Sequence, residues 1–504
     1  MTVDISKVVL AMYDIRGKQE FIFRTNHLKE IVGGSAIIRD CFKDYLYPKA
    51  KKISEKGIFH DEKIQFDRNM FYKHLEDGYI GEVVYEGGGN FFLLFKDAET
   101  FKEITFLFTS EVVRKIGTLK VLGSYIEEIN FDDYKGDAAR LRKVHQRNEH
   151  TESVISPWGT LPIVQVNRMT SMPLVDKYAI LKDKKENGEL IKGKVEKLSK
   201  ESLAKYRKYD EQLKNNAYEI GESVLDNIVT QKGEDSLLAV VYIDGNNMGA
   251  KVGECYRGRT TYEDCVNQLR SFSKDIQKKY IDDRKKDIDD YLSEKYGNER
   301  KRRLVLGAGD EVNFIFNAHD ALDCARVYLE NLPQGCSSCA GIAIFHSHTP
   351  YSEVYRIAEE CCETGKTKMK EMKLEDVSML DFQYCQGAID VSLEQIRTNE
   401  HNIENSKPWL VTKTEEETIP ESITDIKEVD RIQKFLNRLG RGNVKGLLSA
   451  IKTGKTEFLL EMNRIEAHMI KKDREELTNS FKIAKKNPKL IYDMVVTYDI
   501  WFKE

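Results

Sequence analysis

Hydrophobic residues recur along the chain with two spacings, and these spacings alternate in one particular order near the N-terminus. An apolar strand at 8–14 precedes a long amphipathic stretch at 18–52, a hairpin at 82–95, a helical pattern at 98–115 and a strand at 119–126. A period of two residues is typical of a half-buried strand, and a period near 3.6 is typical of a helix. The segment, called the first repeat (8–126), is therefore predicted to fold as β-α-β-β-α-β.

The same order returns in a second repeat (237–372). Its predicted elements are a strand at 237–244, a charged helical stretch to about 296, a hairpin at 303–316, a helix at 318–332, a strand at 340–345 and a helix at 352–372. The hairpins align without a gap, VVYEGGGNFFLLF over LVLGAGDEVNFIF, which places Asn90 opposite Glu311. The opening strands place Asp14 opposite Asp244. We interpret this as a duplicated ferredoxin-like unit; chance similarity between two apolar hairpins is the alternative.

The predicted fold class is α+β, with two ferredoxin-like domains, a helical linker region and a C-terminal helical domain. More than half of residues 182–214 are charged, with both signs mixed, which favours a solvated helical hairpin over a nucleic-acid-facing arm. Residues 426–502 are predicted to form a small bundle with basic faces. The predicted domain bounds are 1–130, 131–235, 236–385 and 386–504.

Composition narrows the classes of protein. With 504 residues, 40% hydrophobic and 32% charged, the chain is neither disordered nor fibrous. A net charge of −4 does not imply nucleic-acid binding by bulk charge. Its longest apolar runs are about seven residues, against the ~20 of a membrane-spanning helix. Nine cysteines and no signal-peptide pattern at the N-terminus favour a cytoplasmic protein with free thiols, without a membrane partner.

Three carboxylates are the candidate chemistry. Asp244 ends an apolar strand in YIDGNNMG, and Asp310 and Glu311 lie in the turn of the second hairpin. In the predicted sheet this strand and this hairpin are neighbours, so the three carboxylates would converge and repel one another without a divalent cation between them. Oxygen ligands favour Mg²⁺ or Mn²⁺, and two such ions can activate a ribose hydroxyl and stabilise leaving pyrophosphate. The alternative is two ordinary polar turns.

Several motifs together resemble a known family. YIDGNNMG, LGAGDEVNFIF and CAGIAIFHSHTPYSEVYRIAEECCETGKTKMK are similar to the second palm domain of the type III CRISPR large subunit, the Csm/Cmr palm-domain polymerase-cyclase ("Cas-ten"). MYDIRGKQEFIF and YEGGGNFFLLF are similar to its first palm domain. The resemblance implies a palm fold shared with polymerases and GGDEF cyclases, and synthesis of cyclic oligoadenylates from ATP when target RNA is bound. Many members carry an N-terminal HD nuclease domain, which this chain is expected to lack because the first palm begins by about residue 8.

The resemblance also assigns the acids. Asp244 falls on the family's first metal-binding Asp, and Asp310 and Glu311 fall on the paired acids of its GGDD turn, with Ala308 and Gly309 on the glycines. Ala replaces a glycine and Glu replaces the last Asp. Because Glu keeps the negative charge of Asp, catalytic activity is expected to be retained, while the identity of the product is left undetermined.

Further residues are predicted to contact the nucleotide. Gly245 and Asn246 follow the strand-ending acid, and Asn246 stands where many members have a second Asp. Lys366 lies where members place a lysine that could contact phosphates; a solvated helix face is the alternative. The first repeat keeps Asp14 but has no acid pair, so we expect no metal chemistry there. Its turn is a candidate cradle for a second nucleotide, or simply a tight turn, formed by Gly87, Gly88, Gly89 and Asn90.

The predicted function is that of a metal-dependent nucleotidyltransferase. It would convert ATP or another NTP to cyclic oligonucleotides or dinucleotides, releasing pyrophosphate, in antiviral signalling. Cys336 and Cys339 form a lone CxxC, so no zinc is expected. The alternatives are a catalytically impaired scaffold of an RNA-guided complex and a stand-alone cyclic-dinucleotide enzyme. Under the resemblance, guide and target RNA and other effector subunits are partners; a homodimer is also open.

Overall fold

A computed structural model describes residues 4–61, 63–87, 90–151, 163–168, 170–186, 189–215, 228, 236–259, 261–297, 302–347, 349–387, 390–399, 405–413 and 419–503. The chain divides into two units. Unit 1 comprises Met1–Val224, Asn247–Ile281 and Val305–Asp310, and unit 2 comprises Leu225–Asn246, Asp282–Leu304 and Glu311–Glu504.

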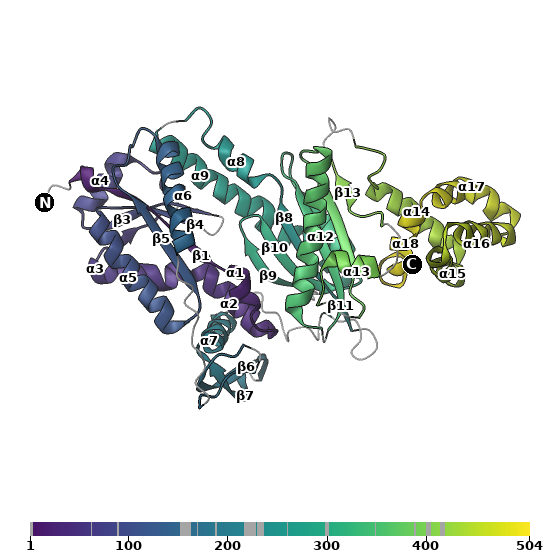
Figure 1. The fold of residues 1–504 in the computed structure, drawn as a ribbon, viewed down its shortest axis with the longest axis horizontal. Coiled ribbons are helices and arrows are strands. Elements are labelled where there is room, and N and C mark those ends of the chain that lie inside the picture. The colour runs from purple at the N-terminus through teal and green to yellow at the C-terminus, as the bar shows by residue number, and fades with distance from the viewer. Residues whose placement is uncertain are drawn as a thin grey trace. The chain divides into compact units, whose positions relative to one another are not determined.

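The first repeat forms a five-stranded sheet in the order β2-β3-β4-β1-β5 (Figure 1). Without the short edge strand β2 this is the ferredoxin-like order, as predicted. β1 pairs antiparallel with both β4 and β5, and in this register Asp14 lies opposite Asn90. The strands are β1 (Val9–Arg16), β2 (Ile58–Phe59), β3 (Gly81–Gly87), β4 (Asn90–Phe95) and β5 (Lys120–Ile126).

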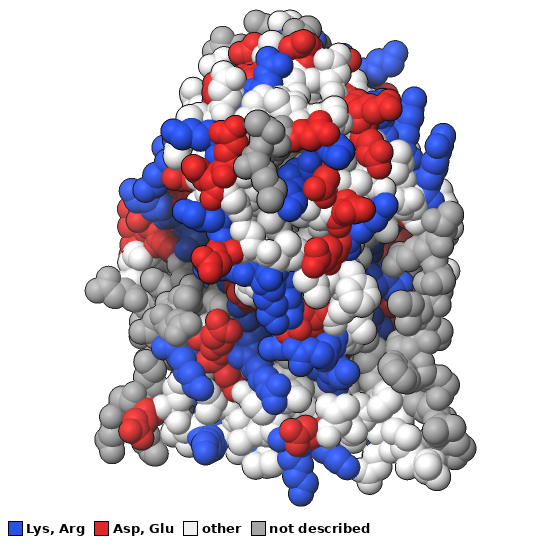
Figure 2. All heavy atoms as spheres, turned by 90° about the vertical axis from the view of Figure 1, so that its left-hand side faces the viewer, with Lys and Arg blue, Asp and Glu red and all other residues white. Residues whose placement is uncertain are grey.

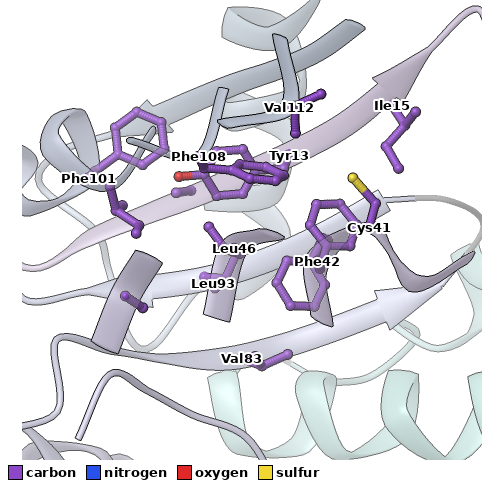
Figure 3. Packing of buried hydrophobic residues seen from close by; sticks show 14 of the residues in the cluster. Tyr13, Ile15, Cys41, Phe42, Leu46, Val83, Leu93, Phe101, Phe108 and Val112 are labelled. Atoms are coloured by element: carbon purple, nitrogen blue, oxygen red, sulfur yellow. The ribbon is translucent and has the colours of Figure 1, made fainter. Parts of the chain in front are cut away.

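Alternate residues of β1 point to opposite faces of this sheet, and each face is covered. Tyr13 belongs to a core shared with helices of one face; its ring lies 5.7 Å from those of Phe101 and Phe108 (Figure 3). Leu10 and Met12 belong to the core of the other face. Both faces of β1 are therefore buried, which explains why its residues form a nearly continuous apolar run. The helices of the first core are α1 (Lys18–Phe23), α2 (Leu28–Cys41), α3 (Tyr47–Ile53) and α5 (Ala98–Lys115).

The second face of the first sheet is covered by α4 (Arg68–Glu76), α6 (Tyr134–Thr151) and α9 (Tyr262–Ile276). Helix α9 and the preceding α8 (Met248–Glu254) belong to the second repeat by sequence, yet both lie in unit 1. The guanidinium of Arg270 on α9 donates to the carbonyls of Val83 and, at 2.8 Å, of Val84 on β3. This helix therefore serves a sheet that is not its own.

The charged linker differs from the prediction. A solvated helical hairpin was expected over 182–214, but residues up to 199 form two long antiparallel strands, β6 (Leu174–Glu186) and β7 (Glu189–Ser199). Among the described residues of 182–214, only those of α7 (Lys200–Asn215) are helical, so the prediction is wrong for 182–186 and 189–199. The cause is a sparse alternation of apolar residues in which Tyr178 and Ile180 pack with Leu198. The charged residues between them had hidden this pattern.

The second repeat forms a six-stranded sheet in the order β13-β12-β11-β8-β10-β9. Strands β11, β8, β10 and β9 give the predicted ferredoxin-like order, and β12 and β13 extend it beyond β11. Helix α12 packs against β8, β11 and β12. The elements are β8 (Leu237–Gly245), α10 (Asp283–Tyr296), β9 (Arg302–Ala308), β10 (Glu311–Asn317), α11 (Ala321–Glu330), β11 (Ser338–His346), α12 (Tyr351–Met372), β12 (Ser378–Tyr384), α13 (Leu393–Asn399) and β13 (Trp409–Thr412).

The C-terminal part is helical, as predicted, and lies in unit 2 with the second sheet. Trp501 donates from its indole nitrogen to the carbonyl of Ala318 at 2.6 Å, and Arg326 pairs with Asp430 at 2.8 Å. The helices are α14 (Ile426–Leu439), α15 (Arg441–Thr453), α16 (Lys455–His468), α17 (Lys471–Lys486) and α18 (Pro488–Val496). Short 3-10 or π-helical turns cover Ile5–Lys7, Phe42–Leu46, Gln277–Asp282 and Tyr498–Phe502.

The nearly equal numbers of basic and acidic residues predict a surface of mixed charge, and one face of the molecule shows it. Basic and acidic side chains are interspersed over the face in Figure 2, with a group of Lys and Arg side chains in its lower half. No helix in the described part of the chain has the length and apolar character needed to cross a membrane.

Candidate functional site

The strand ends that flank the turns of the two hairpins lie at aligned positions. In the second repeat β9 ends at Ala308 and β10 begins at Glu311, so the turn consists of Gly309 and Asp310. In the first repeat β3 ends at Gly87 and β4 begins at Asn90. Asn90 therefore occupies the position of Glu311, as the alignment predicted. Gly88 and Gly89 lie outside the described residues, so the predicted cradle stays a prediction.

Gly309 has a φ of 65°, a left-handed conformation that glycine adopts without steric cost. A Cβ added there would meet no atom within 4 Å. The turn thus has open space beside it, and a nucleotide contact by Ala308 and Gly309 stays a prediction. Asp310 is partly buried and immediately precedes Glu311.

Asp244 lies near the end of β8, opposite Cys339 on the neighbouring strand β11. Its carboxylate accepts a close hydrogen bond from the ammonium of Lys366, which also donates to the carbonyl of Gly245 at 3.2 Å. Burial lowers the pKa of Lys366, but the negative charge of Asp244 and their hydrogen bond raise it more, so its pKa lies above the usual value. The structure therefore joins three of the predicted residues, Asp244, Gly245 and Lys366.

Glu311 is the second acid of this site. Burial is the largest cause that raises its pKa, and the charge of Asp244 adds to it, so that the pKa of Glu311 rises to about 7. The hydroxyl of Tyr355 donates to Glu311 Oε1 at 3.2 Å and opposes the shift. A carboxylate whose charged form is disfavoured by burial and by a neighbouring carboxylate marks a place where a cation is favoured.

Two tyrosines support Glu311, and the sequence analysis did not identify them. The rings of Tyr242 and Tyr355 meet edge to face with centroids 5.5 Å apart. Burial raises the pKa of both hydroxyls, so they stay neutral donors. Tyr355 precedes Lys366 by three helical turns on α12 and so shares its face. Helical periodicity around Lys366 was the signal that could have found it.

Asn246 has a structural place. Its side chain is 3% exposed, and its amide nitrogen donates to the carbonyl of Val377 at 2.9 Å and to the hydroxyl of Ser337 at 3.3 Å. The predicted nucleotide contact by Asn246 stays a prediction. The observed bonds tie the end of β8 to the segments before β11 and β12.

The first repeat surrounds its acid with bases. Asp14 lies 3.2 Å from Arg16, 3.7 Å from Lys18 and 4.0 Å from the imidazole of His145. Burial raises the pKa of Asp14, but the bond from His145 and the charges of Lys18 and Arg16 lower it more, so its pKa is below the usual value. Asp14 is thus neutralised by side chains, while Asp244 has a second carboxylate nearby.

The described residues contain no group of three His, Cys, Asp or Glu side chains placed to hold a metal. The three-carboxylate site formed by Asp244, Asp310 and Glu311 therefore stays a prediction. The donor set nevertheless fits a hard divalent cation, because Asp244 and Glu311 offer only oxygen atoms and the charge of Asp244 raises the pKa of Glu311. Mg²⁺ or Mn²⁺ bound there would supply charge neutralisation for phosphate oxygens and activation of a hydroxyl.

Comparison with solved structures gives low similarity spread over most of the chain. The Csm1-Csm4 cassette in complex with cA4 matches with a TM-score of 0.47 and 12% identity, over 74% of this chain and 54% of that chain. The cassette in complex with AMPPNP matches with a TM-score of 0.46 and 12% identity, over 73% of this chain and 54% of that chain. The Csm1-Csm4 subcomplex in the type III-A CRISPR-Csm interference complex matches with a TM-score of 0.45 and 12% identity, over 74% of this chain and 54% of that chain. TM-scores below 0.5 do not establish a shared fold or function. The chain spans about half the length of the chains it matches.

The search of curated proteins finds no match. The family described as "Cas10/Cmr2, second palm domain" matches residues 237–373, which include the strand, hairpin and helix that carry Asp244, Glu311 and Lys366. The chain therefore contains a second palm domain of the Cas10/Cmr2 family, and the resemblance indicated by its motifs is confirmed for these residues.

Proposed function

We propose that the second palm domain is a metal-dependent nucleotidyltransferase that converts ATP or another NTP into cyclic oligonucleotides or dinucleotides. The observation that carries the proposal is the meeting of Asp244 and Glu311 at adjacent strand ends beside the cation of Lys366. Two neighbouring carboxylates can bind divalent ions, and one ammonium can bind the triphosphate of a substrate that arrives with them.

The proposed reaction joins two nucleotides. A 2′ or 3′ hydroxyl of one nucleotide attacks the α-phosphorus of another, a new O–P bond forms, the bond to the β-phosphate breaks, and pyrophosphate and a proton leave. Asp244, Glu311 and Asp310 would hold two Mg²⁺ or Mn²⁺ ions, which stabilise the charge on the phosphates and activate the hydroxyl. Tyr355 fixes the orientation of the Glu311 carboxylate through its hydroxyl.

The biological setting is part of the proposal. The family that matches residues 237–373 is the second palm domain of Cas10/Cmr2. We infer a role in type III CRISPR-like signalling, with guide and target RNA and other effector subunits as partners of this chain.

A scaffold role is the second candidate. It is favoured by the close pairing of Asp244 with Lys366, an arrangement in which the acid is already satisfied without metal or nucleotide. In that case the chain would organise an RNA-guided complex and synthesise nothing.

The deciding experiment incubates the purified chain, with and without guide RNA, target RNA and the small subunits, with Mg²⁺ or Mn²⁺ and each labelled NTP. The double variant Asp310→Ala/Glu311→Ala should abolish product, while Glu363→Gln on the outer face of α12 should not. Equal product from the wild type and the double variant would refute the assignment of the site. Absence of product under every condition, in a chain that still assembles with RNA and subunits, would favour the scaffold.

A further inference from the structure

The ammonium of Lys366 contacts the carboxylate of Asp244, which is the group proposed to bind the divalent cation. The side chains of Lys366 and Asp244 are 18% and 29% exposed, so their pairing is partly shielded from water. Among the described residues, Lys366 is the basic side chain that forms an ion pair with Asp244. A positive charge thus already compensates the acid before any ion arrives.

The backbone on which Lys366 is mounted is fixed. A Cβ added at the neighbouring Gly365 would lie 3.1 Å from Cys339 Sγ, and one at Gly341 would lie 1.9 Å from the carbonyl oxygen of Ala358. Helix α12 therefore lies directly on β11, and movement of the whole helix is sterically opposed. The long side chain of Lys366 is the part of this arrangement that can move, because its rotatable bonds let the ammonium leave Asp244 without displacing the helix.

We propose that Lys366 is the resident counter-ion of Asp244 and exchanges with the divalent cation, so that metal binding requires the ammonium to move to another anion. The inference deepens the proposed function and rests on Asp244 as a metal ligand. The triphosphate of the substrate is the anion that can receive the displaced ammonium. Nucleotide and metal then favour each other's binding, because each removes the cost of moving Lys366 that the other would meet alone.

The proposal predicts an unusual effect of removing a positive charge. In Lys366→Met, Asp244 is left without its counter-ion, and the chain alone should bind Mn²⁺ about tenfold more tightly than the wild type. A non-hydrolysable ATP analogue should strengthen Mn²⁺ binding in the wild type and much less in the variant. Free Mn²⁺, measured by electron paramagnetic resonance, gives both affinities without reference to turnover.

Three further variants make the test decisive. Lys366→Arg keeps the charge and should stay near the wild type. Lys370→Met removes an exposed lysine of the same helix, paired with Glu363 at 3.7 Å, and should change nothing. Asp244→Asn should weaken Mn²⁺ binding in both backgrounds.

Two failures are distinguishable. If Asp244→Asn weakens Mn²⁺ binding but Lys366→Met leaves it unchanged or weaker, the exchange is refuted and the metal site stands. If Mn²⁺ binding is indifferent to Asp244→Asn, the metal site itself is refuted, and the exchange with it.

Discussion

Asp14 on β1 lies opposite Asn90 on β4, in a sheet that repeats the arrangement of Asp244 and Glu311 with an amide in place of the second acid. In the second sheet the last paired residues are Ile243 and Val312, directly before Asp244 and directly after Glu311. The duplication therefore kept the geometry of the strand ends and changed the charge. The first repeat has one acid paired with several basic side chains, and the second has one acid paired with Lys366 beside a second acid, Glu311.

The first prediction separates these two acids. Asp244→Ala should lower nucleotide turnover at least about hundredfold, because a ligand for the phosphate-neutralising ions is lost. Asp14→Ala should leave turnover within a few fold but lower the free energy of unfolding by about 1–3 kcal/mol, since Lys18 and His145 lose their carboxylate. Initial rates and denaturant titrations measure the two effects. Equal losses of turnover would contradict the asymmetry.

A second prediction concerns the protonation of Glu311 in the metal-free protein. Its pKa of about 7 exceeds the ordinary value of 4.5, so the folded state binds the proton more tightly than the unfolded state does. Stability should then fall as the pH rises from 4.5 to about 7, by up to about 3 kcal/mol relative to Glu311→Gln, and stay level above that. Urea titrations of both proteins with a chelator present measure the difference. The exposed Glu363→Gln should show no such dependence, and a constant difference for Glu311→Gln would contradict the raised pKa.

Gly309 offers a test of backbone conformation. Gly309→Ala should cost about 1–2 kcal/mol through the positive φ alone, because the space beside the residue is open. Gly309→Asn should recover part of the loss, since asparagine tolerates this conformation better than alanine. Hydrogen exchange of the β9–β10 hairpin reports the effect. A fully stable alanine variant would show that the turn does not depend on glycine.

A fourth prediction concerns the support of β3. Arg270 satisfies the carbonyls of Val83, Val84 and Ile64, so Arg270→Ala should cost about 2–4 kcal/mol and raise hydrogen exchange along β3. Ser273→Ala removes one bond, to Glu86 at 2.9 Å, and should cost less. Similar small effects of both substitutions would mean that β3 does not need this helix.

Local pattern was sufficient for much of the fold. Apolar alternation predicted both hairpins, and a period near 3.6 predicted the helix at 98–115 with the bounds that α5 has. Prediction failed at 182–186 and 189–199, where the apolar positions that define the strands are few and charged residues fill the rest. It also did not place α9 on the first sheet, because an amphipathic helix shows that a face is buried but not against which partner.

The site shows the same division. The alignment brought Asp244 and Glu311 to corresponding strand ends, because register follows from hairpin length and pattern. It could not show that Lys366 contacts Asp244 or that Tyr355 donates to Glu311. Both depend on how α12 lies across the sheet, a result of packing at Gly341 and Gly365 rather than of any local signal.

The placement of α9 determines where the chain can be divided into fragments that fold by themselves. Cutting at the bounds of the family match, 237–373, would separate α9 from the sheet it covers and expose its buried Tyr262, Cys265, Val266 and Leu269 to solvent. The first repeat would lose part of the cover of one sheet face by the same cut. Each part would thus lose buried contacts when it is cut from the other, so the smallest fragment expected to fold contains both repeats.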